Sequence, residues 1–485
     1  MKCMVCLALA WVCLVSLAEA LAGAQIAQDL RSTLSSRSRI YLPTDEGWPN
    51  EITQRFNSWN GPTYVVAVKP AVKEDVQKVV KYAAQNNVSF LATGGGHGYS
   101  GTLSALDHGI ELDMGNFKTV SVNAATNRIS VGGSVKFADM MVPTYSAGKA
   151  IPVGGCSCVG ITGATLGGGI GFYSGMYGAT SDSLVSAEIV LASGKLITAS
   201  EHKNAELFWG IKGAGSNFGV VTSLTFKVYD PPSAGQVMNA DMMFPVGLNG
   251  SLWKFASSWV GKQPKELSIM FSMLFDPISQ QLLIIANIIY AGPLSKGQAL
   301  IQPLLDLHPF NLNITYLPWK DIPDSANYGF PAQSCTQTGM TSIPYTVNLY
   351  QINFDVLIAA TKFLSDSFLT TPALRGSLIA FTQYAPHGFQ LYSDKSSAFP
   401  HRDVILYVQL EGAVLNPTDS PAIDSFGQNF RDLLQQSSGR KDVYTHFANG
   451  DEGPVAWYSA RNVRRLRALK ALYDKEGVFS FYNPV

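Results

Sequence analysis

Two glycine-rich segments each place one nucleophilic side chain within nearly bare backbone. The first spans Thr93–Gly101 and reads T-G-G-G-H-G-Y-S-G, and the second spans Gly154–Gly160 and reads G-G-C-S-C-V-G. Glycine lets backbone N–H groups approach a ligand closely, and successive N–H groups form a concave site for phosphate oxygens. His97 and Cys156 carry the only nucleophilic side chains in these stretches of bare backbone that we expect to react. The two segments predict a large anionic cofactor that amides hold and that two side chains bond covalently.

Both segments resemble those of the berberine-bridge-enzyme-like flavin oxidases, a branch of the vanillyl-alcohol-oxidase flavoprotein family. In that branch a G-G-H segment binds the FAD pyrophosphate and attaches its His to the 8α-methyl of the flavin, while the Cys of a G-x-C-x-x-V-G segment attaches to C6. The resemblance therefore implies FAD bonded through His97 and Cys156. The cofactor-binding residues that it implies are Gly94, Gly95, Gly96, His97, Gly98, Tyr99, Cys156, Val159, Gly160, Thr162, Gly163, Gly167, Gly168, Gly169 and Val220.

Further segments at both ends of the chain fit the same family, and the middle is weakly constrained. Asn204–Trp209 fits its N-x-x-L-F-W segment and Gly213–Val221 fits G-x-G-x-N-F-G-V-V. Phe399–Arg402 and Trp457–Phe479 fit its closing pattern. We expect the last stretch to return to the cofactor domain, which would then be discontinuous.

A predicted strand, Val404–Glu411, offers the polar side chains for catalysis. Strand alternation places Tyr407, Gln409 and Glu411 on one face. The resemblance implies that this strand orients or deprotonates the substrate and that Tyr458 lies beside the active site. We expect Tyr458, Gln409 and Tyr407 to be catalytic, with Glu411 the next residue to test. The register of the strand stays open, as does the alternative that these are hydrogen-bonded structural side chains.

Two positions bear on the reaction. Ile170 stands where plant members carry a tyrosine that helps to deprotonate alcohols, which removes one base. Val159 matches a position that gates oxygen, where a small residue accompanies oxidase behaviour. The resemblance implies hydride removal from a small organic substrate, of the secondary-metabolite kind, with O₂ reduced to H₂O₂ and with oxidative cyclisation or dearomatisation as variants. The alternatives are a carbohydrate oxidase and a flavoprotein cyclase or isomerase without net redox chemistry.

The middle of the chain is rich in large apolar side chains, which suit an apolar or aromatic substrate unless they simply fill the core beneath a sheet. These side chains are Met270, Phe271, Met273, Phe275, Tyr290, Trp319 and Tyr328.

Composition limits the partners. With 485 residues, 46% of them hydrophobic, the chain can bury a large core and should form two domains. Lys plus Arg equals Asp plus Glu at 35 each, so no net field attracts nucleic acid or an anionic membrane. We see no metal-ligand spacing and no apolar run beyond the N-terminus that could span a bilayer. The expected partners are a small-molecule substrate and O₂.

The N-terminus has the charged start, apolar centre and A-x-A end of a secretory signal over residues 1–20, although a buried N-terminal helix is an alternative. Asn-x-Ser/Thr sites at Asn87, Asn249 and Asn313 fit a secreted or vesicular glycoprotein.

Removal of the signal leaves three cysteines: Cys156, Cys158 and Cys335. If Cys156 bonds the flavin, neither spacing nor context decides whether the other two pair.

The elements that must position these groups divide the chain. Between residues 64 and 229, β-branched runs alternate with helical periods, which predicts an α+β domain. Neither glycine segment is a Rossmann G-x-G-x-x-G with an acidic residue about twenty positions on. Pro231–Gly235 marks a boundary. We therefore predict a signal (1–20), a first cofactor segment (21–230), a substrate domain (231–440) and a C-terminal return (441–485).

In the substrate domain, Leu267–Phe275 and Gln281–Tyr290 are expected to pair as strands. A helix over Gln298–Leu305 should pack on them, with Pro303 kinking or shortening it. The predicted fold class is α+β: a discontinuous FAD-binding domain of the vanillyl-alcohol-oxidase type, and a substrate domain whose antiparallel sheet carries helices on one face.

Overall fold

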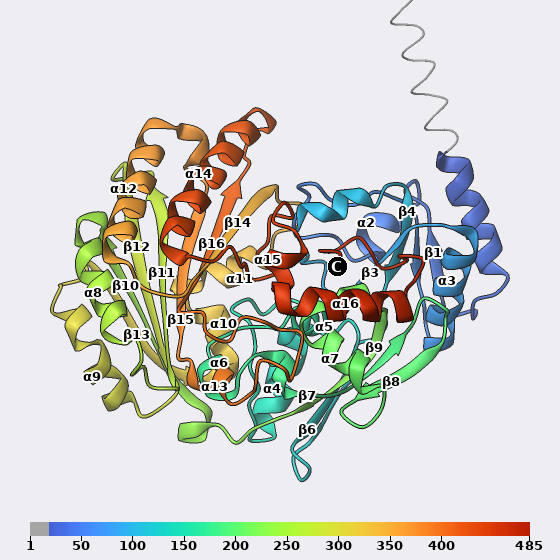
Figure 1. The fold of residues 1–485 in the computed structure, drawn as a ribbon, viewed down its shortest axis with the longest axis horizontal. Coiled ribbons are helices and arrows are strands. Elements are labelled where there is room, and N and C mark those ends of the chain that lie inside the picture. The colour runs from blue at the N-terminus through green and yellow to red at the C-terminus, as the bar shows by residue number, and fades with distance from the viewer. Residues whose placement is uncertain (1–18) are drawn as a thin grey trace, which may run out of the picture.

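A computed structural model describes residues 19–485, so nearly all of the predicted signal lies outside the described residues. Within them the strands form three sheets, two on one side of the molecule and one on the other (Figure 1). Residues 19–31 form a helix beside the smallest sheet.

The first two sheets build the side that carries the glycine segments. The four-stranded sheet has the order β1 (Arg39–Tyr41), β2 (Tyr64–Lys69), β4 (Gly109–Asp113) and β3 (Phe90–Thr93). The five-stranded sheet has the order β5 (Val120–Asn123), β6 (Arg128–Gly132), β9 (Val220–Lys227), β7 (Leu184–Val190) and β8 (Leu196–Ser200). The helices of this side are α2 (Trp48–Glu51), α3 (Lys73–Asn86), α4 (Phe137–Ser146), α5 (Ile161–Leu166), α6 (Ser174–Tyr177) and α7 (Ala205–Ala214).

Burial explains why these strands form. Strand β2 pairs in parallel with β4, and its central residues, 65–68, are all buried, as expected for a parallel strand covered on both faces. Helix α3 buries Val76, Val79, Val80 and Ala83 against it at helical spacing. Here the alternation of a β-branched run and a helical period expected after residue 64 is confirmed.

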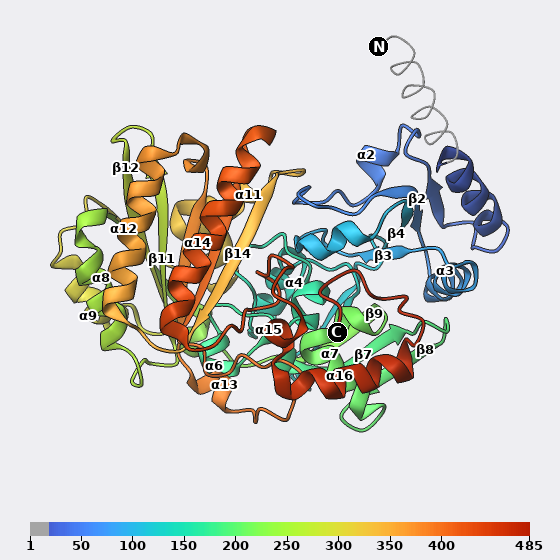
Figure 2. The same cartoon turned by 45° about the horizontal axis from the view of Figure 1, so that its top comes forward.

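The third sheet is antiparallel and seven-stranded. Its order is β13 (Asn311–Pro318), β10 (Gln236–Pro245), β12 (Gln281–Tyr290), β11 (Leu267–Asp276), β15 (Leu378–Tyr384), β16 (Leu406–Ala413) and β14 (Ser342–Leu349). One face is covered by α8 (Asn249–Ser258), α9 (Leu294–Leu305), α12 (Phe354–Thr370) and α14 (Ser420–Ser438), which lie on the outer side in Figure 2. Pro303 lies inside α9 and does not end it. The predicted pairing of β11 with β12 is confirmed.

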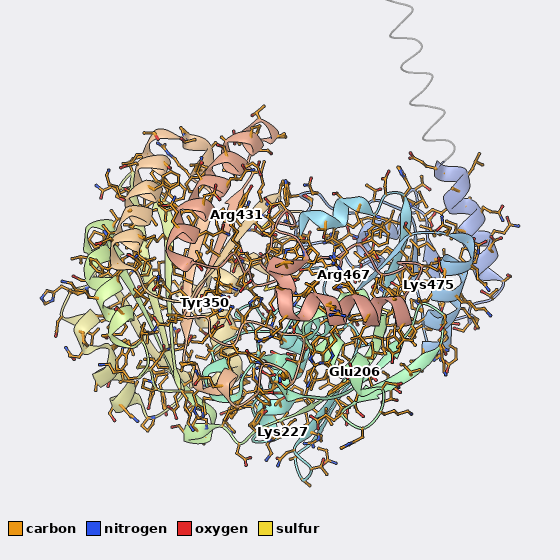
Figure 3. The ribbon with its side chains drawn as sticks, in the orientation of Figure 1. Glu206, Lys227, Tyr350, Arg431, Arg467 and Lys475 are labelled. Atoms are coloured by element: carbon orange, nitrogen blue, oxygen red, sulfur yellow. A yellow bond between two sulfur atoms is a disulfide. The ribbon has the colours of Figure 1, made fainter. Side chains whose placement is uncertain are left out.

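The C-terminal segment crosses back to the first side. Helix α15 (Pro454–Tyr458) packs against α16 (Ala460–Tyr473), and α16 lies beside α7 (Figure 1). Arg465 of α16 pairs with Glu206 of α7, with Nη2 2.7 Å from Oε1; Glu206 is labelled in Figure 3. The chain therefore starts on the side with the glycine segments, passes through the seven-stranded sheet and returns to the first side. The predicted α+β fold class is confirmed, and the boundaries at 230 and 440 stay a prediction.

A disulfide joins the two sides. Cys158, in the second glycine segment, bonds Cys335, which follows the short helices α10 (Ile322–Ser325) and α11 (Phe330–Ser334). Phe330, Pro331 and Ser334 line the cavity described below. The pairing that the sequence left open is thus present in the structure, and it fixes the α10–α11 segment to the glycine segment.

Candidate active site

A cavity of about 520 Å³ lies between the glycine segments and the helix-free face of the seven-stranded sheet. The first glycine segment follows β3, and the second leads into α5. The sheet contributes alternate residues from four neighbouring strands, as strand geometry requires. These residues are Ser268, Met270 and Ser272 on β11, Ile285, Asn287 and Ile289 on β12, Leu378, Ala380, Thr382 and Tyr384 on β15, and Gln409 and Glu411 on β16.

The two glycine segments touch each other, which explains why glycine is needed. A Cβ on Gly95 would lie 2.5 Å from the Gly160 nitrogen, and a Cβ on Gly160 would lie 2.9 Å from the Gly95 nitrogen. At Gly167 a Cβ would lie 2.3 Å from Nε2 of His446. Any side chain at these positions would separate the segments or displace the imidazole. The backbone itself therefore forms this wall of the cavity.

The cavity fits the predicted cofactor. All but one of the fifteen predicted cofactor-binding residues line it; the exception is Gly168, whose φ of +118° turns it against the ring of Phe399. Nothing lies within 4 Å of a Cβ built on Gly163, so the start of α5 is open. The hydroxyl of Thr162 beside it is buried and has no protein partner among the described residues, which fits a ligand acceptor there.

His97 is a neutral imidazole at ordinary pH. Burial, with Lys136 and Arg55 nearby, lowers the pKa of His97 to about 4. Its ring stacks on Phe56, with centroids 4.6 Å apart, and it lines the cavity. A neutral imidazole keeps a lone pair free for bonding, so this environment suits the predicted attachment.

Cys156 is a free, half-buried thiol that lines the same cavity. Burial, followed by the nearby Glu411 and Asp324 carboxyl groups, raises the pKa of Cys156 to about 12. The disulfide removes Cys158 as a rival nucleophile. Because the thiolate is the reactive form, bonding at Cys156 requires loss of its proton.

Three polar side chains, Tyr99 of the first glycine segment and two residues of β16, form one hydrogen-bonded chain in the cavity. Gln409 Nε2 donates to the Tyr99 hydroxyl at 2.8 Å and to Glu411 Oε1 at 2.6 Å. Burial raises the pKa of Glu411 above its ordinary value of 4.5. Burial, and next Glu411, raises the pKa of Tyr99. Glu411 is the only carboxylate of these three side chains, and its ionised form can accept a proton.

The two predicted catalytic tyrosines both donate hydrogen bonds to backbone carbonyls. Tyr458 lines the cavity but is fully buried, and its hydroxyl donates to the Asn483 carbonyl at 2.5 Å and accepts from Asn217 at 3.2 Å. Tyr407 does not line the cavity, and its hydroxyl donates to the His401 carbonyl at 2.9 Å. The Tyr407 ring packs edge-on against that of Tyr444, which does line the cavity.

Three cavity residues were missed by the sequence interpretation: Tyr444, His446 and Tyr482. Tyr444 accepts a hydrogen bond from the Gly169 N–H at 3.0 Å. His446 lies 2.9 Å, through Nε2, from the Ala164 carbonyl and 3.3 Å, through Nδ1, from the Tyr482 hydroxyl. The sequence contains Tyr444 and His446 as a Tyr-x-His segment near the C-terminus. Only the fold shows that this segment lies against the glycine turns around Ala164 and Gly169.

The predicted substrate-binding set needs correction. Of its members only Met270 lines the cavity. Phe271, Met273 and Phe275 point to the helix-covered face, because they alternate with cavity residues along β11, and Tyr290 joins the same core. Trp319 is fully buried in the core of the other side, and Tyr328 bonds the Asp241 and Asn311 carbonyls.

Fold and site together define an FAD-binding cavity that faces an antiparallel sheet. Residues 64–200 match the FAD binding domain family. The chain is 37% identical over 473 residues to the FAD-linked oxidoreductase tazG of Aspergillus terreus, covering 96% of each chain. It is 35% identical over 445 residues to azaL of Aspergillus niger, covering 91% of this chain and 94% of that one. The chain belongs to the FAD-linked oxidoreductases and is an FAD-dependent enzyme.

Solved structures show the same fold across the whole molecule. The berberine-bridge-enzyme-like protein 1 of Physcomitrella patens superposes with a TM-score of 0.83 at 23% identity, covering 95% of this chain and 99% of that chain. The glucooligosaccharide oxidase of Acremonium strictum, which carries a 6-S-cysteinyl, 8α-N1-histidyl FAD, superposes with a TM-score of 0.79 at 21% identity, covering 95% and 98%. The fold is thus that of the berberine-bridge-enzyme-like branch. Among residues 19–485 no helix is both long and apolar enough to cross a membrane.

Proposed function

We propose that this chain is an oxidase that bonds FAD through His97 and Cys156 and oxidises a C–H bond of a small organic substrate at the expense of O₂. One observation supports this most directly: a single cavity holds both nucleophiles and faces the chain of Tyr99, Gln409 and Glu411. When bound, FAD supplies the two-electron chemistry, taking a hydride and passing the electrons to O₂ to give H₂O₂.

The proton that leaves with the hydride goes to Glu411 in this proposal. Its carboxylate lines the cavity, and the raised pKa makes it a stronger base than an exposed carboxylate. Gln409 holds one carboxylate oxygen and cannot itself act as a base. To accept the substrate's proton, Tyr458 would have to lose its hydrogen bond to the Asn483 carbonyl. We therefore assign Tyr458 a role in positioning the C-terminal segment and not in proton transfer.

Two further parts of the proposal concern oxygen and compartment. Val159 of the second glycine segment lines the cavity, and in this proposal its small side chain allows O₂ to approach. A secreted or vesicular glycoprotein is supported by the sequence of residues 1–20 and by the exposed Asn87 and Asn313. Asn249 is half-buried and donates to the Val246 carbonyl at 2.7 Å, so it is the least accessible of the three sites.

The purified holoprotein tests the reaction class. Candidate alcohols and phenols are mixed with it anaerobically while the visible flavin absorbance is followed, and air is then admitted. An oxidase loses the absorbance with substrate and regains it in air with one H₂O₂ per substrate oxidised. Substrate conversion without oxygen uptake would instead identify a cyclase or isomerase, and slow recovery in air would identify a dehydrogenase.

A further inference from the structure

A buried polar cluster lies at the β12 side of the cavity, where β10, β12 and the α10–α11 segment meet. Asp241 of β10 is fully buried and takes part in no ion pair among residues 19–485. Its carboxylate accepts hydrogen bonds from Asn239 Nδ2 at 2.9 Å, from Asn287 Nδ2 at 2.7 Å and from the backbone N–H of Asn327 at 2.8 Å. A buried carboxylate needs such donors in place of solvent, so these three groups are fixed by it.

Asp241 thereby orients the Asn287 amide. Asn287 Nδ2 donates a second hydrogen bond, to Asn239 Oδ1 at 2.7 Å, so both of its N–H groups are used. The side chain is 2% exposed and lines the cavity. The polar atom left over is Oδ1, to which nothing in the described part of the chain donates. This atom can only accept a hydrogen bond.

Asn327 adds a second acceptor at the same end of the cavity. It is 6% exposed, lines the cavity, and its Oδ1 is buried without a partner among the described residues. Its backbone has a φ of +53° and is held there by the hydrogen bond to Asp241. Leaving a buried acceptor without a hydrogen bond is unfavourable, and a ligand donor would satisfy it.

The strand order sets the distance from these acceptors to the reacting end. Strands β12, β11, β15 and β16 are successive neighbours, so Asn287 lies three strand spacings from Gln409. At about 4.8 Å per spacing the separation across the sheet is about 14 Å. The floor between them carries Met270, Leu378 and Ala380 together with the hydroxyls of Ser272 and Thr382, and the cavity surface as a whole is mostly apolar.

We propose that Asn287 and Asn327, backed by Asp241, form an acceptor subsite for a hydroxyl group at the end of the substrate remote from the reacting carbon. The substrate class is then an elongated, mostly apolar molecule with a terminal hydroxyl. The position of the reacting carbon rests on the proposed function. The acceptor subsite rests on the hydrogen bonds and burial alone.

Binding by matched pairs of compounds tests the subsite without turnover. Each pair is a linear arylmethanol of one to three linked rings that carries at its far end either a hydroxyl or the corresponding methyl ether. Dissociation constants are measured anaerobically on the holoprotein by tryptophan fluorescence. The hydroxyl member of the longer pairs should bind about tenfold more tightly or better, because only it can donate to the two amide oxygens.

Variants of the two asparagines test whether the preference for the hydroxyl compound comes from this subsite. Asn287→Leu should abolish it, and Asn327→Ala should reduce it. Met270→Leu, directly across from Asn287 in the β11–β12 pairing, is the control and should change both members of a pair equally.

Equal affinities within every pair for the natural protein, or no binding by any hydroxyl compound, would overturn the inference even if the variants fail to fold. Tighter binding of cellobiose than of the hydroxyaryl compounds would overturn the substrate class. Oxygen uptake is recorded separately. A hydroxyl preference without oxygen uptake would contradict the proposed function and still support the subsite.

Discussion

At the scale of single residues, Glu411 and Gln409 share one strand face yet can do different chemistry. We predict that Glu411→Gln slows anaerobic flavin reduction by about 10²–10⁴-fold with flavin content unchanged, since a positioned base is removed. Gln409→Ala, the control on the same face, should mainly weaken substrate binding. The natural rate should rise with pH through a pKa above 4.5, because burial raises that of Glu411 and its ionised form is the base. A rate that Glu411→Gln leaves unchanged would return the role to Tyr458.

Val159 provides a second test at this scale. A Val159→Ile substitution should slow the recovery of flavin absorbance in air and leave anaerobic reduction largely unaltered, because the added methylene narrows only one side of the cavity. Stopped-flow traces of the two half-reactions make the comparison. Equal slowing of both would show that Val159 does not control oxygen access.

The residue assignments show where local sequence suffices. His97 and Cys156 could be predicted because each stands in a glycine motif whose backbone and nucleophile are contiguous. Tyr458 matched a pattern too, but its hydroxyl is engaged by Asn483, and only the fold shows that contact. Glu411 stood on the predicted face, yet its burial and its bond to Gln409 depend on the packing of both sides of the molecule.

At the scale of elements, the disulfide fixes the α10–α11 segment across the cavity. Replacing both Cys158 and Cys335 by serine should lower the free energy of unfolding by about 2–5 kcal/mol, because a bond between residues 177 positions apart restricts a long loop in the unfolded chain. Urea unfolding of the holoprotein measures this loss. Cys156→Ser is the control that keeps the disulfide. An unchanged urea midpoint in the double variant would contradict the structural role.

Pairings between neighbouring elements could be predicted, and distant ones could not. Strands β11 and β12 follow each other around a short turn, so their alternation and the Asp276-Pro277 breaker suffice. The order of β14, β15 and β16 joins strands separated by helices, and periodicity carries no information about it. The Cys158–Cys335 bond was undecided for the same reason.

At the scale of the whole molecule, buried histidines make stability depend on pH. Burial, with a smaller contribution from Arg440, lowers the pKa of His401 from 6.5 to about 3. Below pH 6.5 the unfolded chain therefore binds a proton that the folded protein excludes, and stability falls by up to about 1.4 kcal/mol per pH unit for this residue until about pH 3. Urea midpoints between pH 7 and 4 should fall less steeply in His401→Asn than in the natural protein. Exposed His202→Asn is the control, and equal slopes in all three proteins would refute the assignment.

The central claim is that one cavity bonds FAD through two side chains, and mass spectrometry after acid denaturation tests it most directly. We predict that the denatured chain carries the mass of one FAD and that proteolysis maps the adduct to the peptides of both His97 and Cys156. His97→Ala and Cys156→Ala should each keep covalent FAD, and the double variant should release it. Release of unmodified FAD from the natural protein on denaturation would contradict the account.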